Sequence, residues 1–456
     1  MTRFHVVGIG GMGMSAIARL LLARGDDVSG SDNGAWPLAQ ALAADGVAVT
    51  TSFESANVEG ADVVIRSSAY GDANPEVAAA RAERIPVWKR DDAWRELAKG
   101  KRVVAVAGTH GKSTTTALTW TALRAGGLDP SLLCGAVLRD LGSNAYAGGG
   151  DILVIEADEY DRAFLALEPE TALVTNVDHD HIDVFPAQAD YAEAFTSFAA
   201  RIVPGGSLVA CADDAGAALL SANAARELPG RTVATYGTAD QASYRVVELM
   251  QGPNGVSFIL TGPFEVPVPV VLRLAGVHNA RNAAGALAAA DAFGVPATAA
   301  AQGFATFTGT ERRLEELGSA GGITVVDDYA HHPAEIRASI DAVRARASAR
   351  VVVLFQPHTP SRLRAFFDDF VGALRTADVR VVAETFASAR EAPDERAGAR
   401  ALASRAGGTY VADAAAGARV LAEQVRPGDV VLVLGAGDIR PAGERLLELL
   451  RERATV

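Results

Sequence analysis

The chain has 456 residues, of which 49% are hydrophobic and 21% are charged, and its formal net charge is −13. One hydrophobic core rarely serves so long a chain, so we expect two or three globular domains rather than a disordered protein. The negative charge argues against binding nucleic acid or an anionic membrane surface over the whole molecule, and no apolar run approaches the ~20 residues of a membrane span. The two cysteines, Cys134 and Cys211, exclude a disulfide framework. The first residues resemble a strand and a turn rather than a leader, so we expect a cytoplasmic protein.

The first 98 residues alternate β-rich runs with helical stretches. This alternation predicts a parallel sheet with helices on its faces. The expected strands lie at 4–10, 27–32, 61–69 and 85–90, and the first expected helix lies at 14–25.

The first expected strand leads into the pattern G-x-G-x-x-G, formed by Gly8, Gly10 and Gly13, and Asp32 ends the next strand. Glycines at these positions let backbone N–H groups approach a pyrophosphate at a helix N-terminus. The pattern is typical of an NAD-dependent dehydrogenase, but a UDP-sugar pyrophosphate would satisfy the same donors. A tight turn without a ligand is the third interpretation.

A second phosphate-binding pattern, AGTHGKSTTT, follows an apolar strand near residue 100. Gly108 and Gly111 bracket the loop, Lys112 can reach phosphate oxygens, and the Ser113 hydroxyl is placed to bind Mg²⁺. A strict Walker pattern has glycine where this chain has Val106, so the loop is a variant. Buried strand, loop and hydroxyl-rich helix start all favour a P-loop over an ordinary turn.

Acidic and imidazole groups end the next two buried strands, predicted at 151–158 and 171–177. Glu156 lies at a strand end, where ligands of α/β sheets collect, and is a candidate metal ligand. His179 and His181 stand among three aspartates in VDHDHID, a set that could hold a second metal. Three further acids are as consistent with a solvated loop as with metal binding: Asp158, Glu159 and Asp161.

Two more polar groups follow. His278, Asn279 and Asn282 open a strongly helical stretch, where the amides could read an adenine edge or cap the helix. Arg312 and Arg313 lie at an expected hinge, where a guanidinium could reach the γ-phosphate of a nucleotide or stay solvated.

The last part of the chain repeats the strand–helix rhythm. Expected strands lie at 323–332, 350–358, 379–385 and 429–438, with a helix at 333–347. The first of these strands ends in a dense polar group that indicates a site: Asp327, Asp328, Tyr329, His331 and His332.

In this order, the segments GIGGMGMS, GTHGKSTTT, EADEYD, TNVDHDHID, HNARNA, GTERR and DDYAHHP resemble the Mur ligase family, most closely its alanine-adding branch. The resemblance covers nearly the whole chain and implies an α/β fold of three domains. Residues 1–98 would form a Rossmann-like UDP-sugar-binding domain, 99–308 a central P-loop ATPase-type domain with a parallel or mixed sheet, and 309–456 a Rossmann-like domain that closes over the active site. The first glycine loop would hold uridine diphosphate and the second ATP. Nicotinamide chemistry does not require a P-loop, so we reject the interpretation of the first glycine pattern as that of a dehydrogenase.

The implied activity is an ATP-dependent, ADP-forming ligation in peptidoglycan synthesis. The lactyl carboxylate of UDP-N-acetylmuramate would attack the γ-phosphate of ATP, and the amine of L-alanine would then displace phosphate from the acyl phosphate. The implied cofactor is Mg²⁺, as two ions. We expect a monomer or homodimer that acts on these small molecules and binds neither nucleic acid nor membrane.

The resemblance also assigns roles residue by residue. The implied catalytic residues are Lys112, Glu156, His181, Arg312 and His331. The implied ATP contacts are Gly108, Thr109, His110, Gly111, Lys112, Ser113, Thr114, His278, Asn279, Asn282, Arg312 and Asp327. The implied UDP-sugar contacts are Gly10, Gly11, Met12, Gly13, Asp32, Ser67 and Ser68, and the implied amino-acid pocket consists of Tyr329, His331 and His332. Ser113 with Glu156 would hold one magnesium, and Glu156 with His181 the second.

The chain departs from the usual family pattern in a few places. Ser113 replaces threonine but keeps the hydroxyl, Ala330 replaces glycine, and QPHTPSR lacks the usual aromatic residue. Tyr160 replaces serine, and murein-peptide recycling ligases carry the same EADEYD segment. The alternatives are therefore a tripeptide-recycling ligase of the same family and a non-catalytic regulator that binds UDP-sugar or nucleotide.

Overall fold

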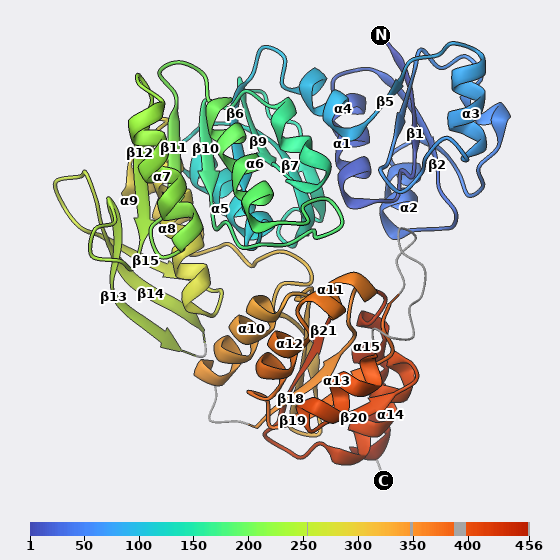
Figure 1. The fold of residues 1–456 in the computed structure, drawn as a ribbon, viewed down its shortest axis with the longest axis vertical. Helices are drawn as coiled ribbons and strands as arrows, with labels where there is room; N and C mark the ends of the chain where they lie inside the picture. Colours follow the sequence, from blue (N-terminus) through green and yellow to red (C-terminus); the bar gives the residue numbers. More distant parts are fainter. Residues whose placement is uncertain (253, 347–349, 387–397, 455–456) are drawn as a thin grey trace.

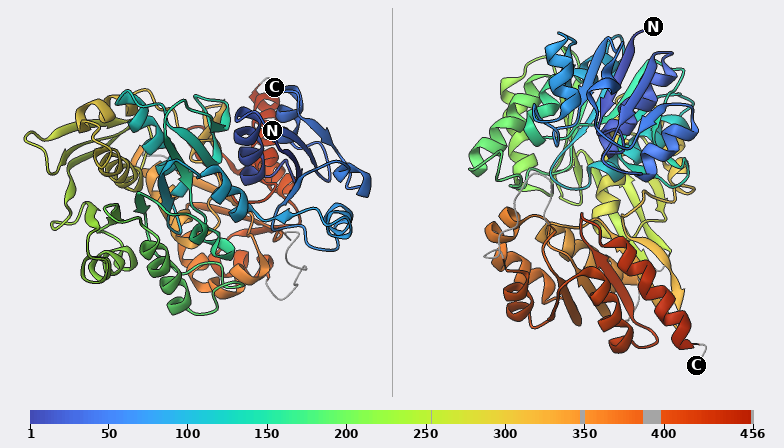
Figure 2. Two further views of the ribbon diagram at one scale, coloured as in Figure 1. Left: turned by 90° about the horizontal axis from the view of Figure 1, so that it is seen from above. Right: turned by 90° about the vertical axis from the view of Figure 1, so that its right-hand side faces the viewer.

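The computed structural model describes residues 1–252, 254–346, 350–386 and 398–454, so Ala347 at the end of one predicted helix lies outside them. The described residues form three sheets covered by helices, one after another along the chain. In Figure 1 the N-terminal and central domains lie side by side with the C-terminal domain below both, and Figure 2 agrees from two further directions. The predicted α/β fold with three domains is confirmed, whereas the boundaries after residues 98 and 308 stay predictions.

The N-terminal sheet has five strands, all parallel, in the order β3-β2-β1-β4-β5. The strands are β1 (Arg3–Val7), β2 (Asp27–Ser31), β3 (Ala48–Thr50), β4 (Val63–Arg66) and β5 (Val87–Trp88). The helices are α1 (Met12–Ala23), α2 (Pro37–Ala44), α3 (Pro75–Ala82), α4 (Arg90–Leu97) and the short 3₁₀ helix η1 (Ser55–Val58). Strand β1 is shorter than predicted because the chain turns at Gly8, whose φ is +80°.

A buried carboxylate ties the N-terminal sheet to α3. Glu76 is 0% exposed, and Ser31 Oγ and Asn57 Nδ2 donate hydrogen bonds to it at 2.5 and 2.6 Å. The Nε2 atom of His5 lies 3.4 Å from the same carboxylate. Burial alone would raise the pKa of this carboxyl, but the polar neighbours outweigh burial and hold the pKa of Glu76 below its usual value.

The central sheet has ten strands in the order β15-β14-β13-β12-β11-β10-β6-β9-β7-β8. It is mixed, since β13, β14 and β15 pair antiparallel, as do β7 and β8, and the rest pair parallel. The strands are β6 (Arg102–Ala107), β7 (Ser131–Leu138), β8 (Ser143–Tyr146), β9 (Ile152–Glu156), β10 (Thr171–Val174), β11 (Ser207–Cys211), β12 (Thr232–Gly237), β13 (Tyr244–Gly252), β14 (Gly255–Thr261) and β15 (Val268–Leu272). The helices are α5 (Lys112–Ala125), η2 (Tyr160–Ala166), α6 (Gln188–Ala200), α7 (Ala215–Glu227), α8 (Val277–Asp291) and α9 (Ala297–Phe304). Because β6, β9 and β10 are neighbours, their carboxyl ends bring three candidate segments to one edge of the sheet.

The C-terminal sheet has six strands in the order β16-β17-β21-β18-β19-β20, and only β16 is antiparallel to its neighbour among the described residues. The strands are β16 (Glu315–Ala320), β17 (Ile323–Asp328), β18 (Val351–Phe355), β19 (Val379–Ala383), β20 (Thr409–Val411) and β21 (Val430–Leu434). The helices are α10 (Pro333–Arg346), α11 (Pro360–Ala365), α12 (Phe367–Leu374), α13 (Ala399–Ala406), α14 (Ala414–Gln424) and α15 (Arg440–Ala454). Val353 and Leu354 of β18 belong to separate apolar clusters, so helices cover both faces of this strand.

Polar contacts join the three domains. Asn144 of the central domain donates hydrogen bonds to the Met12 carbonyl at 2.6 Å and to Ser15 Oγ at 3.0 Å. On the other side, Arg362 of α11 pairs with Asp180, which follows β10, at 2.9 Å. None of the described helices is long and apolar enough to cross a membrane.

Candidate active site

The loop between β6 and α5 has the geometry of a phosphate-binding loop. Gly108 and Gly111 have φ values of +134° and +78°, which only glycine adopts without strain. A Cβ atom at Gly108 would overlap Thr175 Oγ1. Gly111 is the N-cap residue that precedes α5, and no side chain caps this helix, so its first N–H groups and the helix dipole are free to receive an anion.

Lys112 lies over this loop, held by a buried carboxylate. Its Nζ donates to the carbonyls of Gly108 and Thr109 at 2.5 and 3.1 Å and to Glu159 at 2.9 Å. Glu159 is 0% exposed and also accepts a hydrogen bond from Tyr191 at 3.0 Å. Burial opposes the charge on Lys112, but the carboxylates of Glu159 and Asp158 together outweigh burial and raise the lysine pKa above its usual value. The lysine is therefore charged and close to where phosphate would lie.

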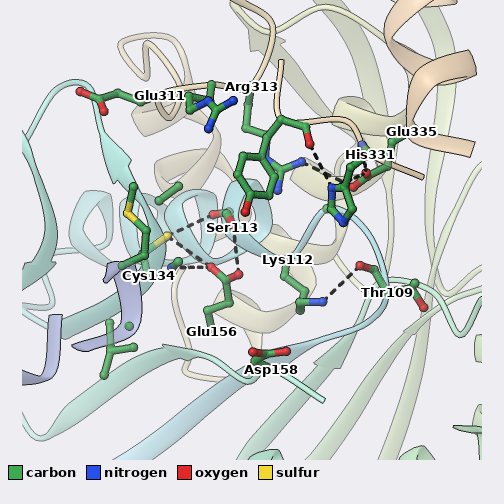
Figure 3. A pocket seen from close by; sticks show the side chains of 18 of the residues that line it. Thr109, Lys112, Ser113, Cys134, Glu156, Asp158, Glu311, Arg313, His331 and Glu335 are labelled. Carbon is green, nitrogen blue, oxygen red and sulfur yellow. Dashed lines mark hydrogen bonds and ion pairs between the residues drawn. The ribbon is translucent and has the colours of Figure 1, made fainter. Parts of the chain in front are cut away.

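Ser113 and Glu156 form the predicted hydroxyl–carboxylate pair. Ser113 Oγ donates to Glu156 Oε1 at 3.0 Å, and Figure 3 shows both side chains pointing into one cavity. The Gly135 N–H donates to the other oxygen of Glu156 at 2.6 Å, and Cys134 Sγ lies 3.6 Å from it. A hydroxyl and a carboxylate so close together are oxygen donors of the kind that Mg²⁺ prefers.

His181 lies beside two acids other than Glu156, which was its predicted partner. Its Nε2 lies 3.5 Å from Glu159, and one ligand atom each from His181, Asp158 and Glu159 lie within 4.8 Å of one another. Burial would raise the pKa of Asp158, but the charges of Arg90 and Lys112 outweigh burial and hold it below its usual value. Asp158 and His181 line the same cavity as Glu156.

This first cavity, of about 320 Å³, is lined by all three domains. The N-terminal domain contributes Met12, Gly13 and Arg90, whose guanidinium pairs with Asp158 at 2.6 Å. The central domain contributes the P-loop and its acids. The C-terminal domain contributes Arg312, Arg313, Tyr329, His331 and Glu335.

A second cavity, of about 210 Å³, adjoins the first on the other side of Gly111. Its polar lining includes His110, Thr114, Asn176, His278, Asn279, Asn282 and Asp328, and its apolar lining includes Leu274, Leu314, Ala334 and Ala338. Asn279 Nδ2 donates to the Ala275 carbonyl at 2.7 Å, and Asn282 Nδ2 donates to Asn279 at 3.2 Å. Burial lowers the pKa of His278 to about 4, so its ring is neutral. Apolar walls with a few amides suit a nucleoside.

Asp327 and Asp328 are adjacent in the sequence, but their side chains lie in different surroundings. Asp327 is 0% exposed and lines neither cavity, because it is enclosed between Arg312 at 3.2 Å and Arg440 at 3.1 Å. Successive residues of a strand point to opposite faces, so Asp328 faces the second cavity instead. Burial raises the pKa of Asp328 to about 6, against the lowering effect of Arg313. Asp327, the predicted ribose contact, therefore does not line the second cavity.

The two arginines also differ. Arg312 donates to Asp327 and, through Nη2, to the Gly435 carbonyl at 2.6 Å, so it mainly joins parts of the C-terminal domain. Arg313 lines both cavities and lies 3.6 Å from Glu335. The sequence named Arg313 only as one of a pair, although its place at the junction suits a phosphate contact better.

Glu335 is a site residue that the sequence did not indicate. It lies in the first turn of α10, accepts backbone N–H bonds from His331 and His332 at 3.0 and 3.2 Å, and lies 3.3 Å from His110 Nδ1. Burial alone would lower the pKa of His110, but the carboxylates of Asp178 and Glu335 raise it to about 9. His331 lines the first cavity, whereas His332 is buried beside His110 with ring centroids 4.6 Å apart. The sequence did carry one signal for Glu335, because it is an acidic residue in the first turn of the helix that follows the HHP segment.

The N-terminal glycine loop reaches the first cavity through only part of its predicted residues, and its role in binding UDP-sugar stays a prediction. Met12 and Gly13 line the first cavity, but Asp32 is only 4% exposed and accepts the Gly10 N–H at 2.8 Å, so it holds the loop from within. Gly11 is part of the same turn, where its N–H donates to the Gly8 carbonyl. The Ser67 hydroxyl accepts the Ala69 N–H at 3.3 Å. Ser68 lines a third cavity, of about 260 Å³, whose charged lining consists of Arg66, Lys89, Arg90, Asp91 and Asp161.

Fold and site together define a nucleotide-using α/β enzyme of three domains. Residues 3–102 match the model described as Mur ligase family, catalytic domain, residues 106–290 match the Mur ligase middle domain, and residues 312–437 match the Mur ligase, glutamate ligase domain. The chain therefore belongs to the Mur ligase family.

Curated relatives and solved structures agree with this. The UDP-N-acetylmuramate–L-alanine ligase of Salinibacter ruber is 41% identical over 98% of this chain and 94% of its own length, and that of Chloroflexus aggregans is 42% identical over the whole of both. The crystal structure of the UDP-N-acetylmuramate-alanine ligase from Thermotoga maritima matches all of both chains with a TM-score of 0.83 at 26% identity. A murein peptide ligase from Psychrobacter arcticus shares the fold, with a TM-score of 0.75 over 99% of both chains at 22% identity.

Proposed function

We propose that this chain is an ATP-dependent ligase that joins L-alanine to the lactyl carboxylate of UDP-N-acetylmuramate, in the cytoplasmic synthesis of peptidoglycan precursors. The observation that carries the proposal is the first cavity, where each of the three domains supplies part of the lining. Mur ligases are ATP-dependent and use Mg²⁺. A cavity at the junction of three domains can bring a nucleotide, an acceptor and an amine to one point.

The P-loop side of the cavity suits phosphoryl transfer. We assign the triphosphate to the N-terminus of α5, with Lys112 at the transferring phosphoryl group and Arg313 on the opposite side. We assign two Mg²⁺ ions, one to Ser113 and Glu156 and the other to His181 with its neighbour Asp158, facing Glu156 across the same cavity. When bound, Mg²⁺ would neutralise phosphate charge as the acceptor carboxylate approaches.

The second cavity suits the adenosine of ATP. The paired amides of Asn279 and Asn282 would read the adenine edge, beside the neutral ring of His278. We assign the ribose contact to Asp328 rather than Asp327, because only Asp328 lines this cavity.

The N-terminal side suits the acceptor. Its diphosphate would lie at the amino end of α1, near Gly13, with the third cavity beside Ser68 extending the site. Asp32 would act indirectly, by holding Gly10 in position.

The C-terminal side suits the incoming amine. Burial lowers the pKa of His331 to about 3, so its ring is neutral. Its Nδ1 faces the Tyr329 carbonyl at 3.0 Å, which leaves Nε2 able to accept a hydrogen bond from the ammonium group of L-alanine. Neither step needs an enzyme nucleophile, because the substrate carboxylate and the amine perform both attacks.

The test is ADP release by the purified chain with UDP-N-acetylmuramate and with L-alanine, glycine, L-serine or a murein tripeptide as the amine. We expect release that requires both UDP-N-acetylmuramate and L-alanine. Lys112→Ala should lose about 10³-fold or more in turnover while it still binds UDP-N-acetylmuramate by calorimetry. The exposed Lys99→Ala is the matched control, since the only ion pair of Lys99 within the described part of the chain is with Glu96 on the surface.

The same assay separates the alternatives. Tyr160, which donates to Asp183 at 3.1 Å and packs edge-on against His181, is the feature that favours a peptide-recycling ligase. Turnover with the tripeptide but not with alanine would move the assignment there. Binding of UDP-sugar without turnover of any amine would leave only the regulator.

A further inference from the structure

A cluster of two imidazoles and a carboxylate lies between the central and C-terminal domains, outside the metal positions assigned above. It consists of His110, Asp178 and His332, which we call the interface triad; one ligand atom from each lies within 4.8 Å of the others. His110 belongs to the P-loop, Asp178 follows β10, and His332 lies between β17 and α10. Two domains therefore share the cluster.

The histidines of the interface triad have unused nitrogen atoms. Nε2 of His110 and Nε2 of His332 are both buried and have no hydrogen-bond partner among the described residues. His332 as a whole is only 5% exposed. Leaving a buried polar atom without a partner is costly, so two such atoms beside one carboxylate indicate a missing ligand. Nε2 of His110 lies 3.6 Å from Asp178 Oδ2, which is too long for a hydrogen bond but short enough for an ion pair when the ring is protonated.

The surroundings orient these groups as outer-shell residues do around a metal. Glu335 lies 3.3 Å from Nδ1 of His110, and a carboxylate on that nitrogen directs the lone pair of Nε2 toward the triad. Thr109 Oγ1 donates to the Asp178 carbonyl at 2.7 Å and accepts the Asp178 N–H at 2.9 Å, which fixes Asp178 against the P-loop.

We propose that the interface triad binds Zn²⁺ or a similar borderline transition-metal ion and thereby links the C-terminal domain to the P-loop. Two imidazoles and one carboxylate, with an open fourth position, form a donor set that Zn²⁺ accepts, whereas Mg²⁺ prefers oxygen donors. Ligands on a tetrahedral Zn²⁺ lie roughly 3.3 Å apart, close to the 3.6 Å between His110 and Asp178. Small side-chain rotations would bring the His332 ring close enough to coordinate the same ion. The ion would replace the proton on His110, since a ligating imidazole nitrogen must be deprotonated.

Because the three donors come from two domains, metal binding should depend on how these domains are arranged. Two ligands come from the central domain and the third from the C-terminal domain, so the ion is held only when the domains are arranged as in Figure 1. Zn²⁺ should therefore raise the unfolding temperature of the full chain, because it binds the assembled form. This inference does not depend on which amine the enzyme uses.

The test is Zn²⁺ binding by the full chain under excess Mg²⁺, measured by equilibrium dialysis with metal analysis and by the absorption spectrum of Co²⁺ in place of Zn²⁺. We expect one bound Zn²⁺ and the intense visible bands of four-coordinate Co²⁺. Glu335→Gln should weaken binding about 10–100-fold, as outer-shell changes do, and His332→Gln or Asp178→Asn should weaken it further.

Two matched controls locate the ion. His179→Gln removes a neighbouring histidine whose ring contacts the Phe185 carbonyl, and His181→Gln removes the only histidine of the Asp158–Glu159–His181 group; both should keep the affinity. Loss of Zn²⁺ in His181→Gln, or unchanged affinity in His332→Gln, would overturn the proposal. So would a wild-type chain that binds no Zn²⁺ or gives only the weak bands of six-coordinate Co²⁺, a result that needs no variant to fold.

Discussion

Removal of the Arg362 guanidinium should separate the C-terminal domain from the central domain. Arg362 donates to Asp180 through Nε at 3.0 Å and through Nη2 at 2.9 and 3.1 Å. The exposed fractions of the two side chains are 10% and 6%. Burial alone would raise the pKa of Asp180, but the charges of Arg362 and of the neighbouring histidines together outweigh burial and hold this pKa well below its usual range. The perturbation is Arg362→Met, which keeps most of the apolar volume and leaves Asp180 buried without its partner.

The expected magnitude follows from this burial. Removal of one partner from a buried ion pair costs about 3–5 kcal/mol, whereas an exposed pair contributes about 0–1 kcal/mol. The two residues belong to different domains, so the cost should appear as opening of the interface rather than as unfolding of either domain. Asp180→Asn in the Arg362→Met background should restore about 1–3 kcal/mol, because the uncompensated charge is then gone.

Hydrogen exchange of the backbone amides near Asp180 and Arg362 measures this opening directly. The control is Arg102→Met, which removes an arginine from a two-bond pair with Glu170 on the surface. If exchange at the interface rises no more in Arg362→Met than in Arg102→Met, the buried pair does not hold the domains together, and the assignment of its energy to docking is wrong.

Three further outcomes are expected. Gly108→Ala should destabilise the chain by about 1–3 kcal/mol and weaken ADP binding in calorimetry, because alanine at a φ of +134° would overlap Thr175; unchanged ADP affinity would contradict the P-loop geometry. The pKa of Glu76 is below its usual value of about 4.3, so its contribution to stability is complete above that pH and is lost as the pH falls toward the folded-state pKa. Melting temperatures between pH 3 and 7 should therefore vary less in Glu76→Gln than in the parent protein. Asp328→Asn should raise the KM for ATP more than Asp327→Asn does at matched stability, and the reverse order would restore the ribose contact to Asp327.

Local patterns predicted the features that depend on local geometry. The glycine spacing around Lys112 predicted the P-loop, since its strand, turn and helix are consecutive in the chain. Glu156 was predicted beside Ser113 because parallel neighbouring strands end at one sheet edge. These inferences need only the order of elements and the positions of glycines.

The rest depends on contacts that the sequence does not contain. Asp327 and Asp328 are equivalent in a motif, and only the pleat of β17 and the packing of Arg440 decide which of them faces the cavity. Arg362 lies 182 residues after Asp180, so no spacing rule links them. Asp32 stood where a ligand-binding acid is expected, but the fold turns its carboxylate onto the backbone of Gly10.

The junction of three domains has a chemical consequence for a mixed anhydride of phosphate and a carboxylic acid. Such a species reacts readily with bulk solvent, and its survival requires a compartment that is dry at the moment it forms. No single domain here provides that compartment, because the lining passes from Met12 through Ser113 to Tyr329. In the proposed reaction, such an intermediate would be sheltered only when all three domains are in place, and a molecule that separates any two of them would divert the activated acid to hydrolysis.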